Sequence, residues 1–170
     1  ENIVGLDLVA GLERASILRN RSGDITTLNS ISGFNVLPGD NLTIQLPVYN
    51  RGVTTSVATT VHITYPDGYE ISESLPALGL YEQFIFEINW HVDINSTIDN
   101  QTIIWEADRG MVNSNDADSE NDIASIPLFI GSSPTFVGSN MVALTNEKIM
   151  LDASNSFDED GGDVWCMFDI

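Results

Sequence analysis

The sequence predicts an all-β protein folded as an antiparallel β-sandwich. Over residues 42–49, apolar side chains occupy every second position: Leu42, Ile44, Leu46 and Val48. This period of two is typical of a strand with one face on a core and the other in water. Similar short strands follow, separated by turn residues and without a convincing helix. Large aromatic side chains gather on one face of these strands, so a second sheet must cover that face.

The N-terminal part is expected to add a strand and an edge loop to the first domain, over residues 1–35. A strand is predicted over 3–10, continued as an edge strand through 15–18, and 20–32 should form a loop or a small hairpin. Pro38-Gly39-Asp40 then predicts a turn, because proline presets φ and glycine tolerates positive φ.

The later strands are predicted from the same alternation, over 57–65, 69–74, 81–92, 101–109 and 123–130. A tight turn is expected at 66–68, and 75–79 should cross between strands. In 57–65 the shared face carries Val57, Thr59, Val61, Ile63 and Tyr65. The predicted core consists of Leu42, Ile44, Leu46, Val48, Val61, Ile63, Phe84, Phe86, Ile88, Trp90, Ile103 and Trp105. Four residues of the last strand, Ala124, Ile126, Leu128 and Ile130, and also Ala107 should point inward.

The charge is strongly negative, with 25 acidic and 6 basic residues among 170 and a net charge of −19. Such a surface repels nucleic acid and anionic membranes, so we expect neither as a partner. It attracts cations and suits a protein that stays soluble at high ionic strength. No apolar run approaches the roughly 18 residues of a membrane span, so no membrane insertion is expected in this segment.

Four Asn-x-Ser/Thr sequons lie at predicted strand ends or turns, at Asn20, Asn41, Asn95 and Asn100. They are glycosylation candidates and favour an extracellular or cell-surface location. With Cys166 as the single cysteine, no disulfide can form within the chain. The start at Glu1 favours a processed product or a segment of something longer.

Residues 36–131 resemble a CARDB domain, the immunoglobulin-like "cell adhesion related domain" of prokaryotic surface proteins. Pro-Gly-Asp-x-Leu-Thr-Ile…Val-Tyr-Asn-Arg-Gly over 38–52 is similar to the early strand of that family. The stretch 75–86 resembles its crossover into an aromatic strand, although the usual glycine is displaced. The stretch 104–108 resembles its penultimate strand, and 118–124 resembles the turn rich in Asp, Glu and Asn before its last strand. The resemblance implies a binding and spacer module with an immunoglobulin-like sandwich.

Residues 132–170 are expected to be a linker and a truncated PKD-like module, the start of a second β-sandwich. Gly-Ser-Ser-Pro over 131–134 has a linker composition. Leu-Asp-Ala-Ser-Asn-Ser-Phe-Asp-Glu-Asp-Gly over 151–161 resembles the opening of a PKD domain.

Calcium is the one metal that the sequence favours. Residues 158–163 pack acidic side chains into a glycine-containing turn, and oxygen ligands suit Ca²⁺. The resemblance to calcium-binding PKD-like domains points to Asn155, Asp158 and Asp160. The alternative is a solvated turn whose aspartates cap backbone amides. A second candidate is the acidic run 116–122. No other cofactor is expected.

No catalytic arrangement is recognisable, so we expect a protein that is not an enzyme. No serine has a nucleophile motif, and His62 and His91 lack ligands at metal spacing, so both are expected to be surface histidines. The predicted function is a non-catalytic structural, adhesion or spacer module of a prokaryotic, archaeal-type surface protein. Its partners would be other surface-protein modules or an extracellular polymer or glycan. One alternative is an accessory substrate-binding or spacer module of a secreted hydrolase. Another is a filament subunit that assembles by β-strand addition.

Overall fold

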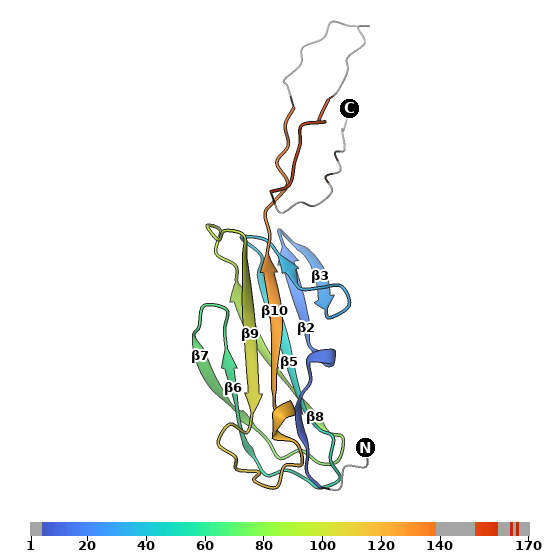
Figure 1. The fold of residues 1–170 in the computed structure, drawn as a ribbon, viewed down its shortest axis with the longest axis vertical. Coiled ribbons are helices and arrows are strands. Elements are labelled where there is room, and N and C mark those ends of the chain that lie inside the picture. Colours follow the sequence, from blue (N-terminus) through green and yellow to red (C-terminus); the bar gives the residue numbers. More distant parts are fainter. Residues whose placement is uncertain (1–4, 139–151, 160–163, 165, 167–170) are drawn as a thin grey trace, which may run out of the picture.

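The predicted β-sandwich is confirmed by the computed structural model, which describes residues 5–138 and 152–159 together with residues 164 and 166. Two five-stranded sheets pack face to face (Figure 1). The described part contains no α-helix, and its two single-turn 3-10 helices are η1 (Leu12–Arg14) and η2 (Ser119–Asn121).

The first sheet is built around its longest strand. Its members are β1 (Leu8–Ala10), β2 (Ser16–Arg21), β3 (Asp24–Asn29), β5 (Asn41–Asn50) and β8 (Gln83–His91). β5 pairs with β8 along one side and with β2 and β1 along the other. β3 extends the sheet as the second arm of a hairpin with β2, so the small hairpin is the outcome for this part of the chain.

The second sheet is antiparallel except at one edge. Its members are β4 (Asn35–Val36), β6 (Thr59–Thr64), β7 (Glu70–Leu75), β9 (Asp99–Ala107) and β10 (Ile123–Ile130). The order is β4-β10-β9-β6-β7, and the short β4 pairs with β10 in parallel. The predicted turn at 66–68 is confirmed, because the Gly68 amide donates to the Tyr65 carbonyl at 2.9 Å.

The expected edge strand through residues 15–18 is interrupted where β5 carries a proline. β1 and β2 lie along the same side of β5, but pairing stops at Ala10–Val48 and resumes at Ser16–Gln45. Pro47 lies in this gap. Because proline has no amide hydrogen, it cannot donate a hydrogen bond to a strand on this side of β5. Residues 11–15 leave the sheet there and form η1, so a single continuous strand was the wrong prediction.

The core lies between the two sheets, and most of its predicted members are buried. The confirmed positions are Leu42, Ile44, Leu46, Val48, Val61, Ile63, Phe86, Ile88, Ile103, Trp105, Ala107, Ile126, Leu128 and Ile130. Trp105 of β9 is 0% exposed, and its indole Nε1 donates to the Pro47 carbonyl of β5 at 3.1 Å. One side chain therefore joins the two sheets through both packing and a hydrogen bond.

Several predicted core positions are wrong. Phe84 is 38% exposed, because it lies near the start of the edge strand β8 and packs edge-on against Phe86. Val57 was predicted to open the strand 57–65, but it precedes β6, is 54% exposed, and has its amide held by the Asn113 side chain in a loop. Trp90 and Ala124 are half-buried at the margin of the core.

Residues 5–36 contribute more to the core than the sequence predicted. Their buried apolar residues are Leu6, Leu8, Ile17, Leu28, Phe34 and Val36. They belong to the same cluster as Trp105. Segment 5–36 is therefore built into the sandwich.

The turn before β5 fastens the hairpin to the sheet. The Asp40 amide donates to the Leu37 carbonyl at 3.1 Å, and Gly39 has φ +88°, which favours glycine. The buried Asp40 carboxylate accepts two 2.8 Å hydrogen bonds from Arg21 and one from the Leu37 amide. Burial alone would raise the pKa of Asp40, but these hydrogen bonds outweigh it and lower the pKa.

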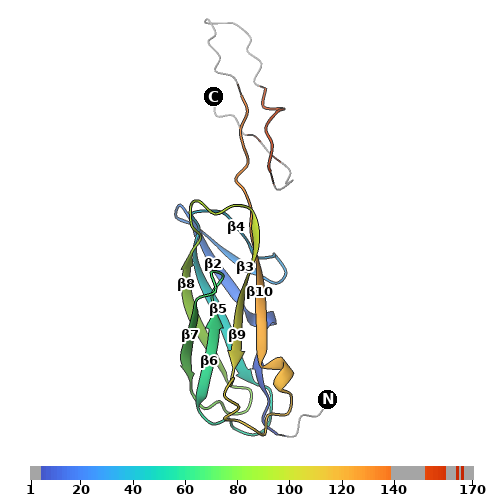
Figure 2. The same cartoon turned by 60° about the vertical axis from the view of Figure 1, so that its left-hand side comes forward.

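The sandwich is elongated, and the chain enters and leaves it at opposite ends (Figures 1 and 2). We define the N-terminal end by the loops 5–7, 51–57 and 108–122, and the C-terminal end by the loops 37–40 and 92–98 with residue 131. Residues 131–138 leave from the C-terminal end. No helix long and apolar enough to cross a membrane occurs in the described part of the chain.

Truncating Trp105 should destabilise the sandwich strongly. Trp105→Ala removes a fully buried ring and should lower the free energy of unfolding by about 3–5 kcal/mol. Trp105→Phe keeps an aromatic ring but loses the indole N–H, and should cost only about 1–2 kcal/mol. Urea unfolding followed by circular dichroism measures both. Midpoints equal to that of the parent would contradict the assigned core.

Candidate functional site

An acidic pocket at the N-terminal end of the sandwich is the strongest candidate site. It has a volume of about 160 Å³ and is lined by Asp108, Met111, Asn113, Ser114, Asp116, Ser119 and Asp122. We call these seven residues the acidic pocket. They come from the loop between β9 and β10 and from η2, next to the N-terminal segment.

Asp108 and Asn113 shape the loop that forms one wall. Asp108 follows β9 directly, and its carboxylate accepts from the Val112 and Asn113 amides at 3.0 and 2.7 Å and from the Thr59 hydroxyl. The Asn113 side chain accepts from the Val57 amide at 2.8 Å and donates to its carbonyl at 3.3 Å. Both side chains are buried and hydrogen-bonded to the loop backbone, so their first role is to hold the loop.

Asp116 ties the pocket to the first strand. One of its oxygens accepts from the Leu8 amide at 2.8 Å, and the other accepts from the Asp118 amide at 3.0 Å. The Ala117 amide donates to the Leu6 carbonyl at 2.9 Å in the same region. Burial raises the pKa of Asp116 despite these hydrogen bonds.

Asp122, just before β10, is the unsatisfied group of the pocket. It is only 7% exposed, and its Oδ1 is buried without a hydrogen-bond partner among the described residues. Burial, followed by the charges of Asp116, Asp108 and other nearby aspartates, raises the pKa of Asp122 to about 8. A carboxylate in this position gains from binding either a proton or a cation.

Arg51 is a basic side chain beside the acidic pocket, and it is already paired with other aspartates. Arg51 Nε donates to Oδ2 of the fully buried Asp7, and its Nη2 lies 4.0 Å from Asp118. The other oxygen of Asp7 accepts from the side-chain Nδ2 of Asn121 at 3.1 Å. Within the described residues, Arg51 is the only basic residue ion-paired to any of these aspartates. The pocket and its surroundings therefore keep an excess of negative charge.

The donor atoms of the acidic pocket are oxygens of carboxylate, amide and hydroxyl groups, apart from the Met111 sulfur. Hard cations prefer such donors. Among the described residues, no three Asp, Glu, His or Cys side chains already stand at the spacing of a metal centre.

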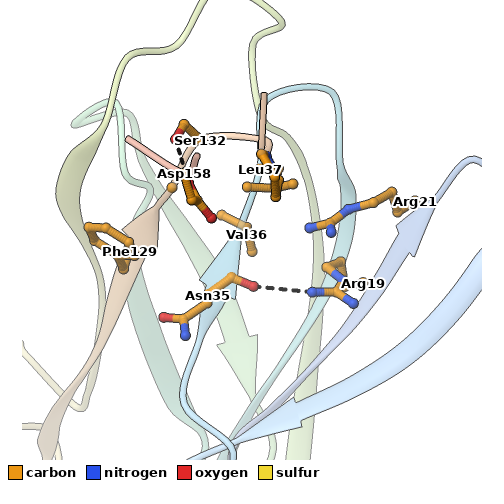
Figure 3. A pocket seen from close by; sticks show the side chains of 10 residues that line it. Arg19, Arg21, Asn35, Val36, Leu37, Phe129, Ser132 and Asp158 are labelled. Atoms are coloured by element: carbon orange, nitrogen blue, oxygen red, sulfur yellow. Dashed lines mark hydrogen bonds between the residues drawn. The ribbon is translucent and has the colours of Figure 1, made fainter. Parts of the chain in front are cut away.

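A second pocket, of about 450 Å³, lies at the C-terminal end (Figure 3). Arg19 and Arg21 line it together with Asp158 of the C-terminal extension. Arg21 is neutralised by Asp40, and Asp158 adds a negative charge to the same lining as Arg19. Since these charges balance, the pocket is better described as a junction with the extension than as a site for a free anion.

The calcium set expected near the C-terminus is only partly described. Asn155 is exposed, and Asp158 is half-buried and accepts from the Ser132 hydroxyl at 3.0 Å. Asp160 lies outside the described residues, as does most of the expected PKD-like module. This site stays a prediction.

The second acidic candidate fares differently. The structure brings Asp116 and Asp122 to one pocket, while Asp118 instead caps η2 by accepting from the Glu120 amide at 3.3 Å. The sequence interpretation missed Asp7, which lies far along the chain from the run 116–122, and it also missed Asp108 and Asn113, which lie just before that run in the same loop. The available signal was an aspartate within an apolar strand, Leu6-Asp7-Leu8.

The remaining predicted positions lie on the surface. All four sequon asparagines, Asn20, Asn41, Asn95 and Asn100, are exposed. His91 is exposed and bonded to Asn41, while His62 is half-buried and bonded to the Ser72 hydroxyl.

Comparison with known proteins supports the fold. No protein-family model matches the sequence, and no curated protein matches it. A crystal structure of the CARDB domain of the PF1109 protein from Pyrococcus furiosus, in complex with di-metal ions, is similar at a TM-score of 0.54 and 15% identity, covering 76% of this chain and 92% of that one. A solution NMR structure of the same domain is similar at 0.50 and 14%, covering 75% and 97%. The chain therefore has an immunoglobulin-like sandwich fold like that of CARDB domains.

The burial of Asp122 should make stability depend on pH. Its folded pKa of about 8 lies above the unfolded value near 3.8, so ionising it costs stability as the pH rises between those values. Asp122→Asn removes the charge and brings amide donors to a pocket rich in acceptors. In the presence of a chelator, this variant should be more stable than the parent at pH 8 by about 1–3 kcal/mol, and less so at pH 5.

Urea unfolding at both pH values measures this difference. Asp67→Asn, at the exposed turn between β6 and β7, makes the same charge change and is the matched control. An advantage of Asp122→Asn that does not grow with pH would show that Asp122 is not held in an unfavourable charged state.

Proposed function

We propose that this chain is a non-catalytic spacer or adhesion module of an extracellular prokaryotic surface protein. The observation that carries the proposal is the position of its two connections at opposite ends of an elongated sandwich (Figure 1). Modules connected in this way extend a polypeptide lengthwise and hold a neighbouring module away from its anchor. The same geometry suits a spacer in a secreted hydrolase, the main alternative.

The first strand, β1, and the last strand, β10, each pair with a neighbouring strand, and this pairing supports a role in carrying mechanical force. All eight residues of β10 pair with β9, and β10 leads directly into the C-terminal connection. β1 pairs with the end of β5, and its Leu8 amide is also held by Asp116. Pulling the two ends apart therefore loads both terminal strands along their length, so that many hydrogen bonds must break together.

Surface chemistry supports an extracellular location. The four sequons lie at or next to the C-terminal end, since Asn20 pairs with Asn41 in the first sheet and Asn100 is near the start of β9. We propose that glycans at these positions surround the connection to the next module. Other surface-protein modules, or an extracellular polymer, are the partners that this arrangement suits.

A cation-binding role is the second candidate function. It is favoured by the net charge of −19, and the CARDB domain of PF1109 was solved with di-metal ions. We retain Asn155, Asp158 and Asp160 as a proposed Ca²⁺ set on their sequence pattern.

Single-molecule force spectroscopy tests the spacer role. The chain is attached at its N-terminus and at the cysteine introduced by Ser133→Cys, and these two points are pulled apart. The exposed Cys166 is replaced by serine, so that the introduced cysteine is the single thiol. We expect rupture at high force, because forced unfolding depends on the barrier to breaking the loaded strands.

The control changes only the direction of pulling. With Val53→Cys as the second attachment, both handles lie at the N-terminal end, and β1 should peel from β5 one pair at a time. The first rupture should then occur at lower force. Equal rupture forces in the two geometries would contradict a load-bearing role.

A further inference from the structure

We propose that the acidic pocket binds one divalent cation, and that Ca²⁺ is the ion its donors favour. This site is separate from the C-terminal set at Asn155, Asp158 and Asp160, and it does not depend on the spacer role. It lies in the loop between β9 and β10, and Asp116 links it to the N-terminal segment by accepting from the Leu8 amide.

The unpartnered oxygen of Asp122 is the first observation behind this proposal. Buried polar atoms are nearly always paired, and an unpaired carboxylate oxygen is especially costly. Asp122 lines the pocket, and its Oδ1 has no hydrogen-bond donor among the described residues. A cation in the pocket would supply the missing interaction.

The local charge is the second observation. Asp108 and Asp116 line the same pocket as Asp122, and Asp7 and Asp118 lie close enough to act on it electrostatically. Arg51 is the one basic residue paired with this group in the described structure, and its shortest contact is with Asp7. Three pocket carboxylates therefore share a small volume with no cation of their own.

The donors select the type of ion. Asn113, Ser114 and Ser119 add amide and hydroxyl oxygens, and no histidine or cysteine lines the pocket. Such a set disfavours zinc and copper. Mg²⁺ requires near-ideal octahedral geometry, whereas Ca²⁺ accepts irregular sites of six to eight oxygens that include waters.

The affinity should be modest. Oxygens of Asp108 and Asp116 already accept backbone hydrogen bonds, and no three acidic side chains of the described residues stand ready to share one ion. The ion would keep part of its water shell. We expect a dissociation constant of about 10⁻⁴–10⁻³ M, the range of extracellular calcium modules.

Calorimetric titration of the full chain with Ca²⁺ at pH 8 tests the proposal. Parent protein, Asp67→Asn and Asp158→Asn should show a saturable heat at this site, and Asp122→Asn should lose it. Melting curves in chelator check that each variant folds, and Ca²⁺ should raise the melting temperature of the parent but not of Asp122→Asn. In ¹H–¹⁵N NMR spectra, Ca²⁺ should shift amides of residues 108–122 first.

Three results would overturn the proposal. Binding by Asp122→Asn equal to that of the parent would place the ion elsewhere. Loss of binding in Asp158→Asn alone would assign it to the C-terminal set. No heat and no change in melting temperature at millimolar Ca²⁺ would show that the pocket holds only a proton. None of these results bears on the force measurement, so the spacer role is judged separately.

Discussion

The contact between Trp105 and Pro47 is the constraint on which the sandwich depends. Trp105 fills the space between the sheets, and its indole N–H bonds to a carbonyl of β5. The same carbonyl accepts from the Gly11 amide at 3.0 Å, at the point where the first sheet changes its pairing strand. Pro47 thus interrupts the pairing of β5 with β1 and β2 in the first sheet, and its carbonyl binds Trp105 of the second sheet. This arrangement makes β5 the strand that positions both ends of the molecule.

The two ends of the sandwich differ in how they balance charge. At the C-terminal end, Arg21 and Asp40 form a closed pair that fastens the hairpin beside β5. At the N-terminal end, Arg51 is engaged by Asp7, and Asp122 is left with an unpaired oxygen. Burial of an unpaired carboxylate is unfavourable, so Asp122 lowers the stability of the folded protein at this end. We infer that the N-terminal end is a site of ligand-dependent stability, while the C-terminal end provides the mechanical connection.

Much of the fold could be predicted from the sequence, because strand alternation reports which face is buried. The positions from Leu42 to Val48 and from Ile126 to Ile130 follow that rule directly. Alternation cannot report what covers a strand, which is why Phe84 on the edge strand β8 was misplaced. It also cannot report contacts between distant segments. The acidic pocket combines Asp108 with Asp122 and lies beside Asp7, and their meeting depends on the pairing of β9 with β10 and on the contact of β1 with β9 across the sandwich. The run 116–122 alone indicated acidic residues without indicating which of them are buried.

Native-state amide hydrogen exchange tests the central claim, that the acidic N-terminal end is stabilised separately from the core. Exchange is measured residue by residue in chelator and again in Ca²⁺. We predict slow exchange in β5 and β9 under both conditions, and faster exchange over 108–122 that slows selectively when Ca²⁺ is added. A uniform change across the whole chain, or unchanged exchange over 108–122, would contradict it.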